Sequence, residues 1–399
     1  MAKANKHLDH LEDRIILEGS QGGKEAIEVL KKMGEMLSGK PGPGLSVTTK
    51  WDGAPAVVCG IDPSDGKFFV GTKSVFAKDA KVCKTQEDIV RFYGSGGGLA
   101  AKLSSALQYL PSSVKQGILQ GDLMFTDDKK SEHIDGQRMI TFRPNTITYA
   151  ADPKSQLGKD IDQARIGIVF HTKYTGTSLA DLTASFNVKD SDFTTGGNVW
   201  AEKAEFKDIG GVASMSATEK SKYDAFIRMA EGSLKKANSM LQEIQSGQKT
   251  LQFDTEFLKF FNNYVKAGRP IPSVMQAYED YMKHIGKEFD KATGKLKSAT
   301  AVNSKTTKWA AQLFFIIKNE EQFKMVIAAY MNLQAAKNIL VEKLKRVSTL
   351  RLFVDKGQGN YECTTPEGFV AISNDKATKL IDRLEFSKLN FTIPKNWDK

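Results

Sequence analysis

Residues 50–53, Lys-Trp-Asp-Gly, place a lysine where it can do chemistry. They lie between two stretches with strand character, residues 45–49 and 54–58, and a tight turn between strands can push a side chain into a pocket. A lysine amine is a nucleophile only when unprotonated, whereas a free lysine titrates at about 10.4. Partial desolvation and neighbouring positive charge lower that pKa. Lys50 is therefore a candidate nucleophile, and the alternative is an ordinary surface lysine on a hairpin.

Five later segments carry residues of the kinds that contact phosphates, metals or bases. They are Gly71-Thr72-Lys73-Ser74, residues 119–124 with Asp122, Ile168-Val169-Phe170, Pro366-Glu367-Gly368-Phe369-Val370, and residues 379–383 with Lys379. Together with residues 50–53 they resemble, in the same order, the motifs of the covalent nucleotidyltransferase superfamily, which contains DNA ligases, RNA ligases and mRNA capping enzymes. Each match is short, and their common order carries the resemblance. It covers residues 45–170 and 362–390.

The resemblance implies a catalytic role for two lysines. Lys50 would attack the α-phosphate of ATP and carry the nucleotide as a phosphoramide, with GTP left open. Lys379 would neutralise the charge that develops on the phosphate, although Lys376 and Lys388 compete for this role. Mg²⁺ (or Mn²⁺) would be held by Glu367 and Asp122, because carboxylate oxygens are the ligands these ions prefer.

The resemblance also implies a nucleotide-binding set, which is Asp52, Gly53, Lys73, Asp122, Phe170 and Glu367. Phe170 would clamp the base, or else lie in the core. Asp122 stands where a Glu is more common in the family, and it would alternatively bond a ribose hydroxyl or simply end a strand. Gly53 permits close approach of the backbone to the nucleotide. Lys73 and Lys379 would help to lower the pKa of Lys50.

The pattern of apolar residues divides the chain into three parts that must position these side chains. Residues 45–206 have strand-like alternation broken by Gly, Pro and an Asp65-Gly66 turn, residues 217–350 have helical spacing, and strand character returns after residue 351. We predict an α+β fold, with a ligase-type adenylation domain of antiparallel sheets and flanking helices, interrupted by an inserted all-helical domain. The expected boundaries are 1–210, 211–350 and 351–399.

Finer features are expected within these parts. Residues 24–37 have the spacing of a helix, and Pro270 with Pro272 marks a break between two helices. The Gly- and Lys-rich stretch 286–308 is predicted to be a long, exposed connection.

The basic charge of the chain is concentrated in its helical part. The net charge is +10, and residues 216–346 contain 22 Lys and Arg against 13 Asp and Glu. An excess confined to one segment favours a polyanion-binding surface, and the alternative is a solvated helical domain that is simply basic. The three scattered cysteines and the lack of a signal peptide or membrane span indicate a cytoplasmic protein without membrane partners.

Three other segments have residue types that suggest binding. His7 and His10 would share a helical face and suit a ligand or phosphate, but they lack a third metal ligand. Residues 94–98, Gly-Ser-Gly-Gly-Gly, lack the lysine of a phosphate-binding loop and read as a flexible loop. Arg143 follows a turn, where it would either contact a phosphate or stabilise the turn.

The expected function follows from the resemblance. It is an ATP-dependent polynucleotide ligase that joins 5′-phosphate to 3′-hydroxyl ends, and RNA is favoured over DNA because too few residues follow Lys379 for the OB-fold of DNA ligases. The compact layout is similar to that of phage-type RNA ligases acting as monomers in the host cytoplasm. Alternatives are a DNA ligase, a non-catalytic nucleic-acid-binding protein on the same scaffold, and a nucleotidyltransferase acting on protein or small molecules.

Overall fold

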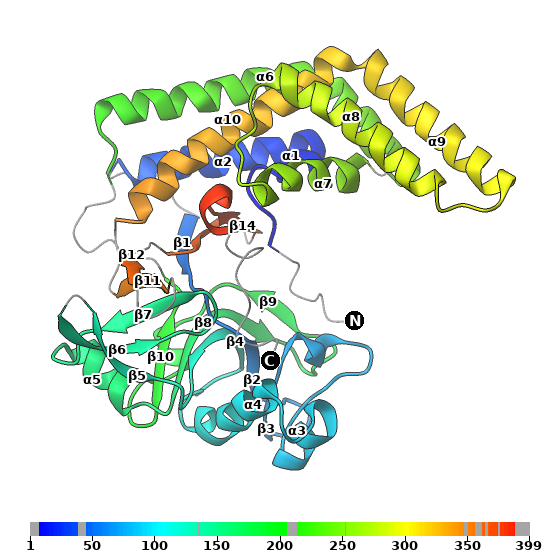
Figure 1. Ribbon diagram of the computed structural model, residues 1–399. Coiled ribbons are helices and arrows are strands. Elements are labelled where there is room, and N and C mark those ends of the chain that lie inside the picture. Colours follow the sequence, from blue (N-terminus) through cyan, green and yellow to red (C-terminus); the bar gives the residue numbers. More distant parts are fainter. Residues whose placement is uncertain are drawn as a thin grey trace.

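The computed structural model describes most of the chain. The described residues are 8–38, 45–134, 136–205, 214–251, 253–346, 350–355, 361–363, 366–373 and 376–387. Helices form one side of the molecule and two sheets form the other, with a third sheet between them (Figure 1).

The helical layer combines two helices from the N-terminal part of the chain with five helices from residues 217–344. Its helices are α1 (Arg14–Leu17), α2 (Gly19–Met36), α6 (Ala217–Leu251), α7 (Phe253–Lys266), α8 (Val274–Thr293), α9 (Ala299–Lys318) and α10 (Glu320–Leu344). One hydrophobic core holds Leu30 of α2, Tyr223 of α6 and Leu333 of α10 together with Phe369 and Leu380 of the middle sheet. The helices and that sheet are thus one packed unit.

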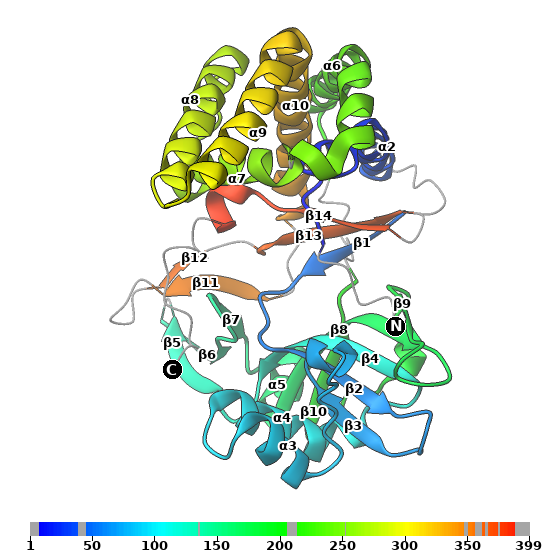
Figure 2. The same ribbon diagram turned by 90° about the vertical axis from the view of Figure 1, so that its right-hand side faces the viewer.

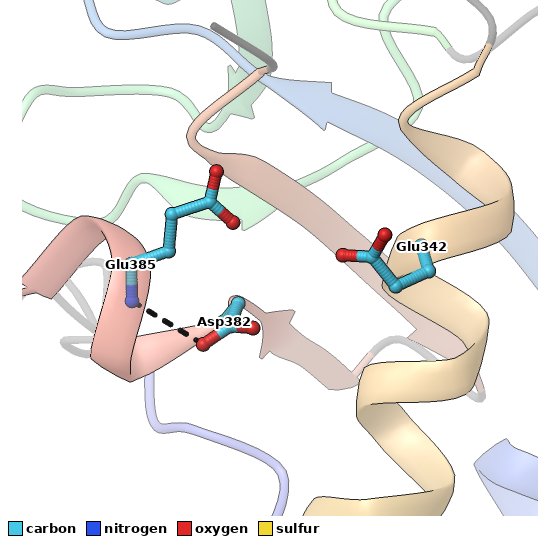
Figure 3. Close-up of side chains that lie close together, drawn as sticks. All are labelled: Glu342, Asp382 and Glu385. Carbon is cyan, nitrogen blue, oxygen red and sulfur yellow. Dashed lines mark hydrogen bonds between the residues drawn. The ribbon is translucent and has the colours of Figure 1, made fainter. Parts of the chain in front are cut away.

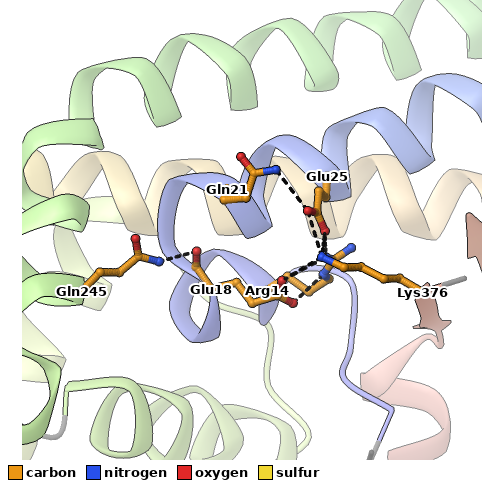
Figure 4. A network of polar contacts seen from close by, with 6 residues as sticks. All are labelled: Arg14, Glu18, Gln21, Glu25, Gln245 and Lys376. Atoms are coloured by element: carbon orange, nitrogen blue, oxygen red, sulfur yellow. Dashed lines mark hydrogen bonds and ion pairs between the residues drawn. The ribbon is translucent and has the colours of Figure 1, made fainter. Parts of the chain in front are cut away.

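The middle sheet has three strands in the order β1-β13-β14. These are β1 (Leu45–Lys50), β13 (Gly368–Ser373) and β14 (Lys376–Leu380), and both pairings are antiparallel. Figure 2 shows this sheet between the helices and the other sheets. A polar network fixes the start of β14 to the helices: Lys376 Nζ lies 2.7 Å from Glu25 Oε2, and Arg14 bonds both Glu25 and Glu18 (Figure 4).

The other two sheets form the far side of the molecule. The six-stranded sheet has the order β10-β8-β4-β2-β3 with β9 paired to β8, and the five-stranded sheet has the order β12-β11-β7-β6-β5. Only the β8–β10 pairing is parallel among the described strands. Their strands are β2 (Ala56–Ile61), β3 (Phe68–Gly71), β4 (Ile118–Phe125), β5 (Lys130–Ile134), β6 (Gln137–Phe142), β7 (Ile147–Ala151), β8 (Ile166–Thr175), β9 (Thr183–Ser185), β10 (Val199–Lys203), β11 (Arg351–Asp355) and β12 (Tyr361–Cys363).

Short helices cover this side. They are α3 (Gln86–Tyr93), α4 (Gly98–Tyr109) and α5 (Gln156–Gln163). Ile89 of α3 and Leu103 of α4 pack on one face of the six-stranded sheet with Val57 and Phe170. The fold is therefore α+β with mainly antiparallel sheets, as expected from the sequence.

Some finer expectations are confirmed and one is wrong. The Asp65-Gly66 turn joins β2 to β3, with Gly66 at a φ of 70°, and Pro270 and Pro272 lie between α7 and α8. The stretch 286–308 is not a long connection, because α8 continues to Thr293 and α9 begins at Ala299. Phe289 stacks on Trp309 with ring centroids 4.6 Å apart, and this contact closes the two helices into a hairpin despite the glycines.

Candidate active site

The lysine of residues 50–53 is the last residue of β1, and a glutamate from the other end of the chain pairs with it. The β1–β13 register places Lys50 opposite Gly368, so that Glu367 is one residue from the pairing position. Lys50 Nζ forms an ion pair with Glu367, which is buried. The structure therefore brings together the first and fifth of the sequence motifs.

Lys379 joins Lys50 on the same face of the middle sheet. Thr48 pairs with Val370 and Val370 pairs with Lys379, and residues two apart on a strand share a face, so the face of Thr48 is also that of Lys50. Burial lowers the pKa of Lys379, and repulsion from Lys50 and then Lys73 lowers it further. Lys73 is exposed and lies two residues after the end of β3. Its positive charge acts on Lys379.

An N-terminal segment extends the same sheet by one bridge. Lys379 N donates to the carbonyl oxygen of Asp9 at 2.9 Å, and Leu11 N donates to that of Lys379 at 3.2 Å. His10 lies between them, and its buried Nδ1 has no hydrogen-bond partner in the described part of the chain. Burial lowers the pKa of His10 well below its usual value, and Arg383, Lys337, Lys379 and Lys50 lower it further. His10 is thus a neutral ring beside a group of cations.

Asp52 anchors the turn after Lys50 to the five-stranded sheet. Its Oδ1 accepts a hydrogen bond from Asn145 Nδ2 at 2.8 Å, and its Oδ2 accepts from the backbone N–H groups of Thr146 and Ile147, each at 2.7 Å. The side chain is buried and both oxygens are engaged. This arrangement gives Asp52 a positioning role, because it holds the turn after Lys50 against the start of β7.

Trp51 and Arg143 support the same junction. Trp51 stacks on Tyr149, with ring centroids 5.4 Å apart, and Tyr149 Oη accepts a hydrogen bond from Asp52 N at 2.8 Å. Arg143 Nε donates to the carbonyl oxygen of Asn145 at 3.3 Å. Of the two alternatives for Arg143, these contacts favour stabilisation of the turn that receives Asp52.

Gly53 allows the turn to lie directly on β4. A Cβ at this position would lie 2.5 Å from Asp122 Cβ and 3.0 Å from Met124 Sδ. No side chain fits this space without displacing Asp122 or the turn. Gly53 therefore sets the position of Lys50 relative to Asp122 through close packing within the protein.

Three carboxylates act on the Lys50 amine. Burial lowers the pKa of Lys50, but Glu367, Asp122 and Asp52 more than offset this, and the pKa is raised. The expectation that its neighbours lower this pKa is thus wrong for the protein alone, because the carboxylates outweigh Lys379 and Lys73. The Asp122 carboxylate has no hydrogen bond within the described residues, and His171 Nε2 lies 3.7 Å from Asp122 Oδ1.

Two carboxylates of this site are those expected from the sequence to hold a divalent cation. Glu367 and Asp122 come from different sheets, and both are close enough to raise the pKa of Lys50. Oxygen ligands from carboxylates suit Mg²⁺. Asp52 is excluded as a ligand because its oxygens are already bonded within the protein.

Phe170 lies on the opposite face of the six-stranded sheet. It is 0% exposed and packs against Phe193, with ring centroids 5.2 Å apart, under α3 and α4. The base-clamping role expected of Phe170 is therefore corrected to a core role. His171 follows Phe170 in β8 and therefore lies on the other face, on the side of Asp122, where the register of β4 and β8 shifts between Gln120 and Gly121.

A hollow of about 640 Å³ adjoins the site. It is lined by residues of β1, β8, β10, β13 and the 185–190 segment, and among these are Thr48, His171 and Lys203. Phe170 also borders it, although its side chain is 0% exposed. Thr48 is two residues before Lys50, and His171 contacts Asp122. Sequence reasoning missed His171, although an imidazole next to the apolar run of β8 was a visible signal.

A second acidic group lies outside this site. Glu342, Asp382 and Glu385 approach one another near the end of α10 (Figure 3). Lys345 Nζ lies 3.1 Å from Glu342 Oε1 and also pairs with Glu385. The protein itself thus supplies a cation to this group. Lys388 lies outside the described residues.

The fold and site define an α+β protein with a half-buried lysine paired to a buried carboxylate at the junction of three sheets. The chain belongs to the Family of unknown function (DUF6267), which matches residues 5–395. Comparison with curated proteins and with solved structures gives no match. Among the described helices, none is long and apolar enough to cross a membrane.

Proposed function

We propose that the chain is an ATP-dependent polynucleotide ligase, with RNA favoured as substrate, that forms a covalent lysyl-AMP on Lys50. The observation that supports the proposal most is the placement of Lys50, Glu367 and Lys379 on adjoining strands of one sheet. These residues come from three separate motifs of the resemblance. A sheet face that served only for packing would not need a lysine beside both a carboxylate and a second lysine.

The proposed reaction begins with the Lys50 amine. Its lone pair attacks the α-phosphorus of ATP, a phosphorus–nitrogen bond forms, the bond to the β-phosphate oxygen breaks, and pyrophosphate leaves. Lys379 stabilises the negative charge that develops on the phosphate oxygens. The Lys50 ammonium of the free protein must give up a proton, to the paired Glu367 carboxylate or to solvent, before its nitrogen can attack.

A divalent cation held by Glu367 and Asp122 would add positive charge beside the phosphate and provide Glu367 with another partner than Lys50. The later steps of the proposal transfer AMP to a 5′-phosphate and displace it with a 3′-hydroxyl, which forms the phosphodiester. His171 and the adjoining hollow offer polar groups for the nucleotide or the 5′-phosphate. We also propose that the protein acts as a monomer in the cytoplasm, since the chemistry requires no second subunit.

Labelled ATP or GTP and a denaturing gel test the first step. Wild type is expected to retain label from ATP with Mg²⁺ or Mn²⁺. Lys50→Arg is the sharpest control, since arginine keeps a cation for Glu367 but remains protonated and cannot form the adduct. Loss of label in Lys50→Arg, with unchanged unfolding temperature, supports the proposal. Equal labelling of wild type and Lys50→Arg contradicts it.

One observation favours a second function. Three carboxylates raise the pKa of Lys50 and so favour its charged form. A stable ion pair of this kind would also suit a protein that has lost the ligase reaction and keeps the pair only for its structure. A non-catalytic nucleic-acid-binding protein on this scaffold would bind RNA or DNA but take no label at any metal concentration. A DNA ligase would label and then join nicked DNA faster than RNA ends. Label without any joining of RNA or DNA would point to protein or small-molecule acceptors.

A further inference from the structure

The α8–α9 hairpin concentrates the positive charge of the helical layer. Residues 291–318 contain six lysines and no Asp or Glu, so they account for six of the nine excess positive charges of residues 216–346. Lys283 and Lys287 of α8 extend the same hairpin. All eight lysines are exposed; they are Lys283, Lys287, Lys291, Lys295, Lys297, Lys305, Lys308 and Lys318, called here the hairpin lysines.

The hairpin lysines are nearly free of internal partners. Within the described residues, the ion pair they form is that of Lys291 with Glu288, at 3.9 Å between two exposed side chains. By contrast, Lys324, Lys337, Lys343 and Lys345 of the neighbouring α10 region each have carboxylate partners. The charge of the hairpin is therefore available to an outside anion, whereas that of α10 is used within the fold.

The shape of the hairpin presents this charge outward. Each of its helices has 20 residues, which corresponds to a length of about 30 Å. The connection between them projects beyond the other helices and the sheets (Figure 1). An extended basic arm with a length of several phosphate spacings suits a polymer of phosphates better than a single small anion.

An exposed aromatic ring adds a second kind of contact. Phe314 of α9 is 70% exposed, and Ile317 is 54% exposed. Lys318 is four residues after Phe314, so both lie on one helical face. A ring on a basic surface offers a stacking surface to an unpaired base, whereas a duplex keeps its bases inside.

We propose that the α8–α9 hairpin, residues 283–318, binds a single-stranded polynucleotide through its phosphates, with Phe314 stacking on a base. This surface would hold the substrate strand of the ligase and so deepens the proposed function. Binding itself requires neither ATP nor Lys50, and it is measured without nucleotide.

The test compares two variants with the same change in net charge. The hairpin variant carries Lys291→Gln, Lys295→Gln, Lys297→Gln and Lys305→Gln. The control variant carries Lys67→Gln, Lys130→Gln, Lys154→Gln and Lys159→Gln. These four lysines are exposed and belong to the part of the molecule that contains the five- and six-stranded sheets. Affinity for a short single-stranded RNA of mixed sequence, and for DNA of the same sequence, is measured over a range of salt concentrations.

Wild type is expected to bind less tightly as salt rises. The hairpin variant should flatten the log–log slope by up to about 2.8, since each lost phosphate contact with a single strand removes about 0.7. The control variant should keep the wild-type slope. Phe314→Leu should weaken binding several-fold without a change of slope, and an RNA duplex should bind more weakly than the single strand.

Several results would overturn the inference. They are an absence of RNA and DNA binding by wild type at low salt, equal slopes for the hairpin and control variants, or equal competition by an acidic peptide of matched charge, which would indicate a protein partner. Lys50 labelling is followed in parallel. A hairpin variant that labels normally but binds RNA weakly supports the inference, and a wild type that binds RNA through the hairpin without labelling sinks the proposed function alone.

Discussion

Lys50 and Glu367 form an ion pair although 317 residues separate them in the chain. The pair exists only when β1 and β13 are aligned, and these strands form the floor of the helical layer through Val47, Phe369 and Ala371. Assembly of the helical layer and assembly of the site are therefore coupled. A helical segment that resembles an insertion in the sequence is part of the support of the candidate nucleophile.

Glu367→Gln is expected to lower the pKa of Lys50. The carboxylate of Glu367 favours the charged amine, and its loss leaves burial and the repulsion of Lys379 with less opposition. The pH dependence of Lys50 acylation by a small amine-reactive reagent, followed by mass spectrometry without nucleotide, measures this. The midpoint should move to lower pH in the variant, while exposed Lys283 in the same protein should not change. An unmoved Lys50 midpoint would show that the ion pair does not control the amine.

Gly53→Ala is expected to reduce Lys50 labelling at least about tenfold and to lower stability by about 1–3 kcal/mol, since its Cβ would meet Asp122 at 2.5 Å. Gly232→Ala is the matched control, because a Cβ there meets nothing within 4 Å and the residue is within α6. The control should label normally and be slightly stabilised. Urea unfolding and initial labelling rates measure both effects. Full labelling by Gly53→Ala would refute the close-packing argument.

Phe170→Leu and His171→Ala are expected to separate core packing from nucleotide contact. Phe170→Leu should lower stability by about 1 kcal/mol and leave the ATP concentration for half-maximal labelling unchanged, since the ring is buried on the far face of the sheet. His171→Ala should raise that concentration several-fold, because His171 contacts Asp122 and lines the adjoining hollow. The reverse pattern would restore the base-clamping role of Phe170.

Acid is expected to loosen the attachment of β14 to the helices. Despite partial burial, hydrogen bonds from Lys376, Gln21 and Arg14 lower the pKa of Glu25 to about 2. A carboxyl with a depressed pKa stabilises the fold above its ordinary pKa of 4.5, and this contribution is lost as pH falls towards 2. Glu25→Gln should therefore be destabilising at pH 7 and nearly neutral at pH 2. A difference between wild type and variant that does not shrink on acidification would contradict this.

The sequence predicted the α+β fold class, because this class depends on local pattern, and the order of motifs assigned Lys50 and Glu367 to one site. Their ion pair was not predicted, because Glu367 was expected to hold a metal ion. It could not predict the face of Phe170, because the apolar run of β8 is buried on both faces. Ile168 and Phe170 lie on the face covered by α3 and α4, whereas Val169 lies on the other face. The hairpin contact of Phe289 with Trp309 was also hidden. Two helices that meet through single aromatic residues leave a Gly- and Lys-rich sequence between them that resembles a loop.

In the proposed reaction, Lys50 itself carries the nucleotide. Wild-type protein incubated with ATP and Mg²⁺, digested under conditions that preserve a phosphoramide, and analysed by tandem mass spectrometry tests this directly. We expect an adduct of AMP mass on the peptide that contains Lys50, its release as AMP in acid, and its absence from Lys50→Arg. An adduct on Lys379, Lys73 or any other residue, or an unmodified Lys50 at every metal and nucleotide concentration tried, would contradict it.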